Sequence, residues 1–446
     1  MRPGGGSRPA RPWLLPWLPR LASAAAGLFY RVRISGAAVP GMGPVLLVAN
    51  HPNAMLDPVL VAAAARRPVR FLAKAPLLTD RRIGWLVRAA GAIPVYRPQD
   101  DPTAMSGNAD MFGAVEAALA DGAAIALFPE GISHDAPAMT ELKTGAARIA
   151  LGKRVRDVVA IVPVGLVLRD KQTFRSDAIV VIGDAVTWDD LRASDTHDVA
   201  AVKALTGRID AALRTVTVNL DRIEDAPLVE CAEAVYAVER AGRVDAATKL
   251  ARLRIAADTL REVRNDRGWH PLLAALRRHL RALERLDLSP SDLHAATDIR
   301  TAARWALGRL PLALLPMLAV GAAGHLIWWP PYRLTGIAAS RIAGPADMRA
   351  TYKFGVGAVV YSVWLIVVCV TIGIGASAGW GGAAVVVLPV LGIAGLWIRE
   401  RWRSAWVDAR RFFVLRRRPA LLRELRRRQA ELAERLDQLL RSRRVV

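Results

Sequence analysis

Between residues 45 and 169, short apolar runs alternate with segments of helical period, which is typical of a βαβ arrangement with a largely parallel sheet. β-branched and apolar runs predict strands at 45–49, 123–128, 160–163 and 178–182. Apolar residues on one face predict helices at 58–66, 111–120 and 141–152. We therefore predict an α/β domain over residues 31–190, a mixed, largely parallel sheet flanked by helices. Active-site groups of such folds gather at the carboxyl ends of the strands.

The next stretch, residues 191–304, is charged and has a helical period. Its clearest apolar stripe consists of Val202, Leu205, Ile209 and Leu213, and a later one consists of Leu273, Leu276, Leu280 and Leu283. No motif in this stretch carries chemistry. We predict a helical extension that packs on the α/β domain or on lipid.

A membrane region is expected over residues 305–400, because three long apolar segments occur there, at 310–329, 356–376 and 381–398. A glycine-rich turn joins the last two, which predicts a spanning hairpin. The first contains Pro311 and Pro316, so it either spans or is re-entrant. If both flanking domains lie on one side of the membrane, the number of crossings is even, which favours two spans.

Both ends of the chain are basic. Residues 1–30 form a basic tail followed by an interfacial segment at 12–30, where prolines interrupt what would otherwise resemble an export signal. The arginine-rich tail at 401–446 should be cytoplasmic by the positive-inside rule. Its apolar stripe predicts either binding to an anionic surface or a short self-associating helix. The stripe consists of Leu421, Leu422, Leu425, Leu432, Leu436 and Leu439.

Composition supports the membrane assignment. The chain is 53% hydrophobic and carries a net charge of +22, so its partners are anionic. Most of the 13 tryptophans lie in or beside apolar stretches, which is typical of membrane interfaces and not of base stacking. We therefore expect a phospholipid membrane and no nucleic acid as partner. The 2 cysteines provide neither a disulfide framework nor a metal site.

The first block that carries chemistry places His51 directly after the predicted strand 45–49 and Asp57 at the start of the next helix. The pKa of a histidine lies near neutrality, so the ring accepts a proton from an alcohol. A carboxylate on the other ring nitrogen would fix its tautomer. Taken alone, a histidine at a strand end more often makes a structural hydrogen bond than acts in catalysis. Three further blocks favour the catalytic interpretation.

Three further blocks follow in order. An apolar run from Gly91 ends in Arg97, whose planar guanidinium suits a phosphate. Residues 127–134 place Glu130 and Gly131 at a strand end, and Lys143 beyond them offers a second phosphate donor. The fourth block, 161–165, is apolar and centred on Pro163. For Arg97 and Lys143 in so basic a chain, ordinary surface charge is the plain alternative.

Together, in this order and over about 120 residues, the four blocks resemble the glycerol-3-phosphate and lysophosphatidate acyltransferase superfamily. The resemblance implies an αβ-fold with the acyl chain in an apolar groove near the membrane, and it covers roughly residues 30–190. It implies His51 and Asp57 as the catalytic residues. The substrate-site residues that it implies are Arg97, Glu130, Gly131 and Pro163. Lys143 is assigned to phosphate by its charge and position, and Asn53 and Ser133, which lie within the first and third blocks, complete the predicted substrate-binding set.

One departure concerns spacing. Five residues separate His51 from Asp57, where the commonest family motif has four, so the sequence ranks Asp57 below His51. The His-x-Asn form with the longer spacing is similar to the branch that acts on glycerol-3-phosphate or dihydroxyacetone phosphate. Residues 347–354, just before the predicted hairpin, resemble that branch too.

The sequence thus predicts a glycerolipid O-acyltransferase that moves an acyl group from acyl-CoA or acyl-ACP to glycerol-3-phosphate, dihydroxyacetone phosphate or a lysophospholipid. The thioester is a co-substrate, and we expect no cofactor and no metal. Signatures of serine hydrolases, nucleotide hydrolases and zinc enzymes are absent from the sequence. We expect a bacterial-type inner membrane with the catalytic domain in the cytoplasm. The alternatives are a non-catalytic lipid-binding membrane scaffold and a nucleic-acid binder, and the sequence leaves the oligomeric state unknown.

Overall fold

The computed structural model describes residues 12–81, 83–97, 103, 106–242, 245–295, 314–342 and 349–444. The chain divides into two compact units. The first, here called the sheet unit, comprises Met1–Ile223, Val244–Asp258 and Ala346–Ala350. The second, the helical unit, comprises Glu224–Arg243, Thr259–Pro345 and Thr351–Val446. Each unit is described by itself.

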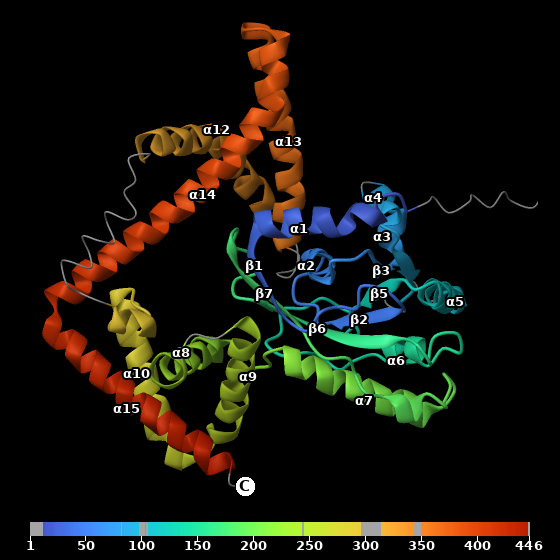
Figure 1. The fold of residues 1–446 in the computed structure, drawn as a ribbon, viewed down its shortest axis with the longest axis horizontal. Coiled ribbons are helices and arrows are strands. Elements are labelled where there is room, and N and C mark those ends of the chain that lie inside the picture. The colour runs from blue at the N-terminus through green and yellow to red at the C-terminus, as the bar shows by residue number, and fades with distance from the viewer. Residues whose placement is uncertain are drawn as a thin grey trace, which may run out of the picture. The chain divides into compact units, whose positions relative to one another are not determined.

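The described part of the sheet unit is built on a seven-stranded sheet with the order β1-β7-β6-β2-β5-β3-β4 (Figure 1). Strands β2 to β6 run parallel to their neighbours, whereas β7, with β1 parallel beside it, pairs antiparallel with β6. The strands are β1 Tyr30–Gly36, β2 Val45–Ala49, β3 Val69–Lys74, β4 Ile93–Val95, β5 Ala124–Leu127, β6 Ala160–Leu168 and β7 Ser176–Ile182. The predicted mixed, largely parallel sheet flanked by helices is confirmed.

Helices cover both faces of this sheet (Figure 1). On one face α2 packs against the strands and α1 packs on α2. On the other face α5, α6 and α7 enclose the main hydrophobic core. The helices of this unit are η1 Leu15–Trp17, α1 Leu18–Phe29, α2 Leu56–Ala65, α3 Ala75–Thr79, α4 Gly84–Ala89, α5 Gly107–Ala120, α6 Gly145–Ala150, η3 Asp189–Leu191 and α7 Val199–Val216. Helix α9, Ala246–Val263, begins in this unit.

Several elements differ from the predicted ones, among them β1, β3 and α6. Strand β1 was not predicted. Its exposed arginines alternate with less polar residues, because it lies at an edge of the sheet and one side of it meets solvent. Strand β3 was not predicted either. Helix α6 begins at Gly145 and not at residue 141, since the backbone N–H of Lys143 donates to the carbonyl of Pro129 (2.7 Å) and keeps the preceding residues out of the helix.

Helix α7 belongs to the core of the sheet unit. The stripe predicted from sequence is buried in it, with Leu205 and Leu213 fully enclosed. Where α7 ends, a Cβ at Gly165 of β6 would lie 1.7 Å from the Val216 carbonyl oxygen, so only glycine permits this approach. The compact unit therefore continues to Ile223, past the predicted domain limit at residue 190, and α7 packs on the sheet rather than on lipid.

The helical unit contains α8 Ala226–Tyr236, the π-helix η5 Ala237–Ala241, η6 Arg267–Trp269, α10 His270–Leu286, η7 Pro290–His294, α12 Leu314–Ser340, α13 Arg349–Gly375, α14 Ala378–Arg417 and α15 Pro419–Arg444, with η4 Ile223–Asp225 at its start. Helix α15 packs against α8 and α10. Leu425, Leu432 and Leu439 of its apolar stripe are buried. The predicted surface-binding or self-associating role of this stripe is therefore corrected: its apolar face is used inside the molecule.

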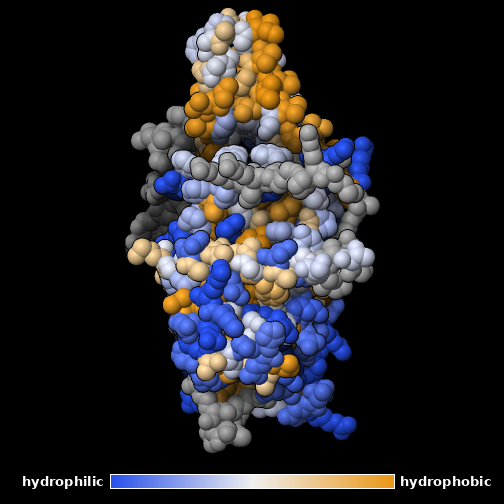
Figure 2. All heavy atoms as spheres, turned by 90° about the vertical axis from the view of Figure 1, so that its right-hand side faces the viewer, coloured by the Kyte–Doolittle hydropathy of each residue, from blue (hydrophilic) through white to orange (hydrophobic). Residues whose placement is uncertain are grey.

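Helices α13 and α14 contain the two candidate membrane spans found among the described residues. Side chains on α13 such as Ile366 and Ile374 are well exposed, and Figure 2 shows apolar side chains gathered at the end where α13 turns into α14. Helix α14 continues beyond the predicted segment 381–398 as far as Arg417. Both helices have the length and composition that a bilayer span requires.

Helix α12 packs on α14 through glycine faces. A Cβ at Gly324 would lie 2.5 Å from the Leu391 carbonyl oxygen and 3.3 Å from the Cα of Gly395, a close approach typical of helices that associate in membranes. Helix α12 is not one of the candidate spans among the described residues. Residues 310–313 of the predicted first apolar segment lie outside the described residues.

Candidate functional site

The predicted site residues come from loops at one edge of the sheet. His51 follows β2, Arg97 follows β4 and Glu130 follows β5. Because β2, β5, β3 and β4 are parallel neighbours, their carboxyl ends share this edge. The topology therefore brings together three blocks that are far apart along the chain.

His51 and Asp57 form a hydrogen-bonded pair. The ring nitrogen Nδ1 of His51 lies 2.8 Å from Oδ2 of Asp57. The side chain of His51 is 18% exposed, whereas that of Asp57 is completely buried. The spacing of five intervening residues therefore allows the two side chains to meet, although the sequence had ranked Asp57 below His51 because of that spacing. With Nδ1 carrying the hydrogen, Nε2 keeps its lone pair and can accept a proton.

The Asp57 carboxyl is held at the start of α2. The backbone N–H of Asn53 donates to the same Oδ2 at 2.6 Å, so this oxygen receives two donors. Burial raises the pKa of Asp57, and the hydrogen bond from His51 opposes this effect. A buried carboxyl that is hydrogen-bonded to the ring suits the transient stabilisation of an imidazolium.

Glu130 fastens the loop after β5 to the loop after β2. Its Oε1 accepts from the backbone N–H of His51 (2.9 Å), and its Oε2 accepts from Thr140 N–H (2.8 Å) and lies 2.5 Å from Nε2 of His134. The side chain is 2% exposed. The structure thus places Glu130, predicted to bind substrate, in a position where protein groups occupy both oxygens and where it orients His51.

The loop that follows His51 is fixed by two more contacts from the third block. Oγ of Ser133 accepts from the backbone N–H of Ala54 at 3.0 Å. Ala54 adopts a left-handed conformation with φ 45°, a costly geometry for a residue with a side chain. Phe128 stacks on the His51 ring with centroids 4.0 Å apart. These contacts restrict the ring to one orientation.

Arg97 and Lys143 approach Gly131 from different elements. Nη1 of Arg97 donates to the Gly131 carbonyl at 2.9 Å. The chain of Lys143 passes over Gly131, with its Cγ 3.5 Å from where a Cβ would be, and Gly131 itself has φ +73°. A guanidinium is planar and carries five N–H donors, a geometry that suits a phosphate. The structure therefore places both predicted phosphate ligands beside the third block.

Pro163 and Asn50 make contacts within the sheet. Pro163 is buried inside β6 opposite Val48, and its Cγ lies 2.8 Å from where a Cβ of Gly183 would be. The Asn50 amide donates to the Leu166 carbonyl (3.0 Å) and accepts from the Leu166 N–H (2.7 Å). Asn50 thereby extends the pairing of β2 with β6 by one rung and fixes the residue before His51.

Tyr30 was missed by the sequence analysis. Its hydroxyl, on β1, donates to the Lys171 carbonyl (2.7 Å) and accepts from Nδ2 of Asn53 (2.6 Å). Tyr30 is 1% exposed, and burial raises its pKa, so the hydroxyl stays protonated. Asn53 is buried as well, and its side chain is bound to Tyr30 rather than exposed to substrate. A single tyrosine at the start of an edge strand belongs to no sequence motif, so no signal in the sequence pointed to it.

We expect Tyr30→Phe to lower kcat roughly tenfold with little change in KM for the acceptor. The substitution removes the acceptor of the Asn53 amide and the donor to Lys171, a loss of about 1–3 kcal/mol in orienting energy for the Asn53–Asp57 contact. Steady-state kinetics over a range of pH would measure it, with Tyr236→Phe on α8 as the matched control. A variant that changes only thermal stability, with an unchanged kcat and pH profile, would contradict this positioning role.

The arrangement can carry out one elementary step. Nε2 of His51 accepts a proton from a hydroxyl in front of the ring, and Asp57 behind the ring stabilises the resulting imidazolium. Within the residues that the structure describes, no hydrogen bond engages Nε2 of His51. Arg97 and Lys143 lie beside Gly131, the residue after the glutamate that binds the His51 backbone.

Comparison with known proteins identifies the segment around this site. Residues 31–167 match the Acyltransferase family model. Over 301 residues the chain is 26% identical to an uncharacterized acyltransferase of Schizosaccharomyces pombe, an alignment that covers 47% of this chain and 44% of that protein. It is 31% identical over 134 residues to glycerol-3-phosphate O-acyltransferase 2 of Saccharomyces cerevisiae, covering 29% of this chain and 18% of that one.

Two bacterial proteins are similar as well. A lyso-ornithine lipid O-acyltransferase of Rhodobacter capsulatus is 33% identical over 140 residues, which is 31% of this chain and 46% of that protein. The crystal structure of PlsC, the 1-acyl-sn-glycerophosphate acyltransferase of Thermotoga maritima, aligns with 18% identity and a TM-score of 0.34, over 46% of this chain and 78% of that one. The chain thus spans less than half the length of each of the three sequence relatives described.

Proposed function

We propose, from the premise that residues 31–167 are a domain of the acyltransferase family, that this chain transfers a fatty acyl group from a thioester to a hydroxyl of a phosphorylated glycerol acceptor. The observation that carries the proposal is the His51–Asp57 pair at the carboxyl end of β2, with the ring partly exposed. The named acyltransferase relatives support the reaction class.

In the proposed reaction His51 removes the hydroxyl proton while the oxygen attacks the thioester carbonyl. The C–O bond forms, the C–S bond breaks, and the proton held on His51 passes to the departing thiolate, so no covalent acyl-enzyme is required. Asp57 keeps the ring in the reactive tautomer. Asn53, Glu130 and Ser133 hold the loop that carries His51.

Release of coenzyme A from an acyl-CoA by the purified full-length protein tests the proposal. A panel of glycerol-3-phosphate, dihydroxyacetone phosphate and a lysophospholipid, each assayed against a no-acceptor control, identifies the acceptor, and acyl-ACP replaces acyl-CoA in a parallel series. Thiol release that depends on an acceptor supports the proposal. A non-catalytic lipid-binding scaffold would release no thiol with any acceptor or donor.

Arg97 is proposed to bind the acceptor phosphate, because its guanidinium lies beside Gly131 at the edge that carries His51. We expect Arg97→Ala to raise KM for the phosphorylated acceptor roughly tenfold or more and to leave KM for the acyl donor nearly unchanged. Arg97→Lys keeps the charge but loses the planar fork, so its effect should be intermediate. An equal change in both KM values would assign Arg97 to loop structure alone.

Membrane attachment is proposed through α13 and α14. Their lengths, apolar composition and exposed aliphatic side chains support a two-span hairpin. The arginines that follow in α14 and α15 favour a cytoplasmic end by the positive-inside rule, and an even number of crossings then puts the sheet unit on the same side. Protease accessibility of the two units in sealed vesicles would test this orientation.

A further inference from the structure

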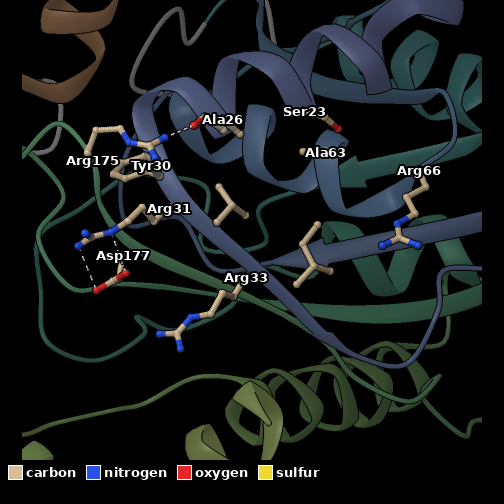
Figure 3. A pocket seen from close by; sticks show the side chains of 12 residues that line it. Ser23, Ala26, Tyr30, Arg31, Arg33, Ala63, Arg66, Arg175 and Asp177 are labelled. Atoms are coloured by element: carbon tan, nitrogen blue, oxygen red, sulfur yellow. Dashed lines mark hydrogen bonds and ion pairs between the residues drawn. The ribbon is translucent and has the colours of Figure 1, made fainter. Parts of the chain in front are cut away.

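A groove runs beside the edge strand β1 in the sheet unit. It has a volume of about 890 Å³ and lies between α1, the start of β1 and the end of α2 (Figure 3). Its apolar lining includes Ala26, Val32 and Ala63. Tyr30 also lines it, so this groove reaches the residue whose hydroxyl binds Asn53.

Four arginines line the groove, against one carboxylate. Arg31 pairs with Asp177 at 3.2 Å, and Arg175 donates to the carbonyl of Gly27. The other two, Arg33 and Arg66, are exposed and have neither a hydrogen bond nor an ion pair among the described residues. Figure 3 shows their guanidinium groups in different parts of the groove. The groove therefore carries excess positive charge that fits an anionic group.

Helix α1, which forms one wall of the groove, has the surface of an interfacial helix. Trp17 before it and Leu21 and Leu28 on it are 50–55% exposed and recur at spacings of four and seven residues, which places them on one face. Ala22 and Ala26 face α2 instead. An exposed stripe of tryptophan and leucine is typical of a helix that lies in the headgroup region of a bilayer.

The diameter of a helix indicates where the groove lies relative to the bilayer surface. An α-helix with side chains is about 10–12 Å across, and the apolar face of an interfacial helix enters the bilayer by roughly 5–10 Å. The groove-lining residues Ser23 and Gly27 lie on the side of α1 away from the exposed stripe. For a helix at that depth, the groove on its other side lies at the level of the lipid phosphates rather than of the acyl chains.

We propose that this groove binds the phosphate headgroup of an anionic phospholipid from the bilayer on which α1 lies. Arg66, on the side of β1 that faces α2, supplies the charge-assisted hydrogen bonds, and Arg33 adds positive charge from the other side of β1. The small apolar residues of the lining accommodate the glycerol part. The inference rests on the membrane association proposed above. It adds a lipid site that is separate from the substrate site at Arg97 and Lys143.

Binding of a short-chain lipid to the full-length protein in neutral detergent tests the site. Dihexanoyl phosphatidylglycerol is compared with dihexanoyl phosphatidylcholine and with inorganic phosphate, and hydrogen exchange of peptides covering residues 30–36 reports where binding occurs. We expect phosphatidylglycerol to protect these peptides, phosphatidylcholine to protect them at least about tenfold less well, and phosphate alone to have little effect. The double variant Arg33→Gln, Arg66→Gln should weaken phosphatidylglycerol binding about tenfold or more.

Arg154→Gln is the matched control, because Arg154 is exposed in the same unit and has no hydrogen bond or ion pair with any described residue. Equal affinity of wild type and the double variant would overturn the proposal, as would equal binding of the zwitterionic lipid. Protection by inorganic phosphate as strong as that by phosphatidylglycerol would reduce the groove to a general anion site. Thiol release measured on the same samples reports separately on the proposed acyl transfer.

Discussion

Replacing His51 with alanine is expected to lower the rate of acyl transfer by about 10²–10⁴, because general base catalysis of an alcohol contributes that much. The ring is the partly exposed group at the site that pairs a proton-accepting nitrogen with a buried carboxylate. KM values should change little by comparison, since the phosphate and acyl contacts remain. Acceptor-dependent thiol release by the purified variant measures the effect.

The thermal stability of the variant must be measured alongside its activity, because the His51 ring also stacks on Phe128 with centroids 4.0 Å apart and its loss can affect folding. His51→Gln keeps more of the side-chain volume and should be as inactive as the alanine variant. His197→Ala, at an exposed histidine of the same unit, is the matched control and should be fully active. A His51 variant that retains wild-type turnover would remove the basis of the proposed function.

Asp57→Asn should lower kcat by about 10²–10⁴ with a nearly unchanged structure. The amide can still occupy the site beside Nδ1, but it cannot stabilise an imidazolium, and its NH₂ group can donate to the ring and favour the wrong tautomer. Oδ2 of Asp57 also accepts from the Asn53 N–H at 2.6 Å. An asparagine that keeps its oxygen at this position retains both bonds, whereas one that turns its NH₂ group to the ring also loses the bond from Asn53. An active Asp57→Asn protein would show that the 2.8 Å contact with His51 is structural only.

For the same variant we also predict how the free energy of unfolding depends on pH. Burial raises the pKa of Asp57 in the folded protein above the unfolded value of about 3.9. The folded state therefore keeps its proton at a pH at which the unfolded state has lost it, so this group contributes less stability as pH rises above about 4. Asp57→Asn does not titrate, so the difference between its unfolding midpoint and that of the wild type should shift in favour of the variant as the pH rises above about 4. A constant difference across that range would contradict the raised pKa.

Alternation of apolar runs and helical segments predicted a largely parallel sheet flanked by helices, with strands β2, β5, β6 and β7, without a structure. Strands β2, β5 and β7 were predicted nearly to the residue, because buried strands consist of uninterrupted apolar runs. The stripe of α7 was predicted for the same reason, since its period of 3.6 residues is local information. His51, Asp57 and Arg97 were found because each directly follows a strand or begins a helix.

Tertiary structure alone decided which groups meet. The contact between His51 and Asp57 depends on how the loop of residues 51–55 turns, and that turn is fixed by Glu130 and Ser133 from a distant strand end. Tyr30 reaches Asn53 only because an edge strand far along the sheet lies beside the loop after β6. Such contacts are set by the packing of the whole unit, whereas a sequence pattern records only the periodicity of each element by itself. The leucine stripe of α15 shows the same limit, because its period indicated an apolar face but not that α8 and α10 would cover it.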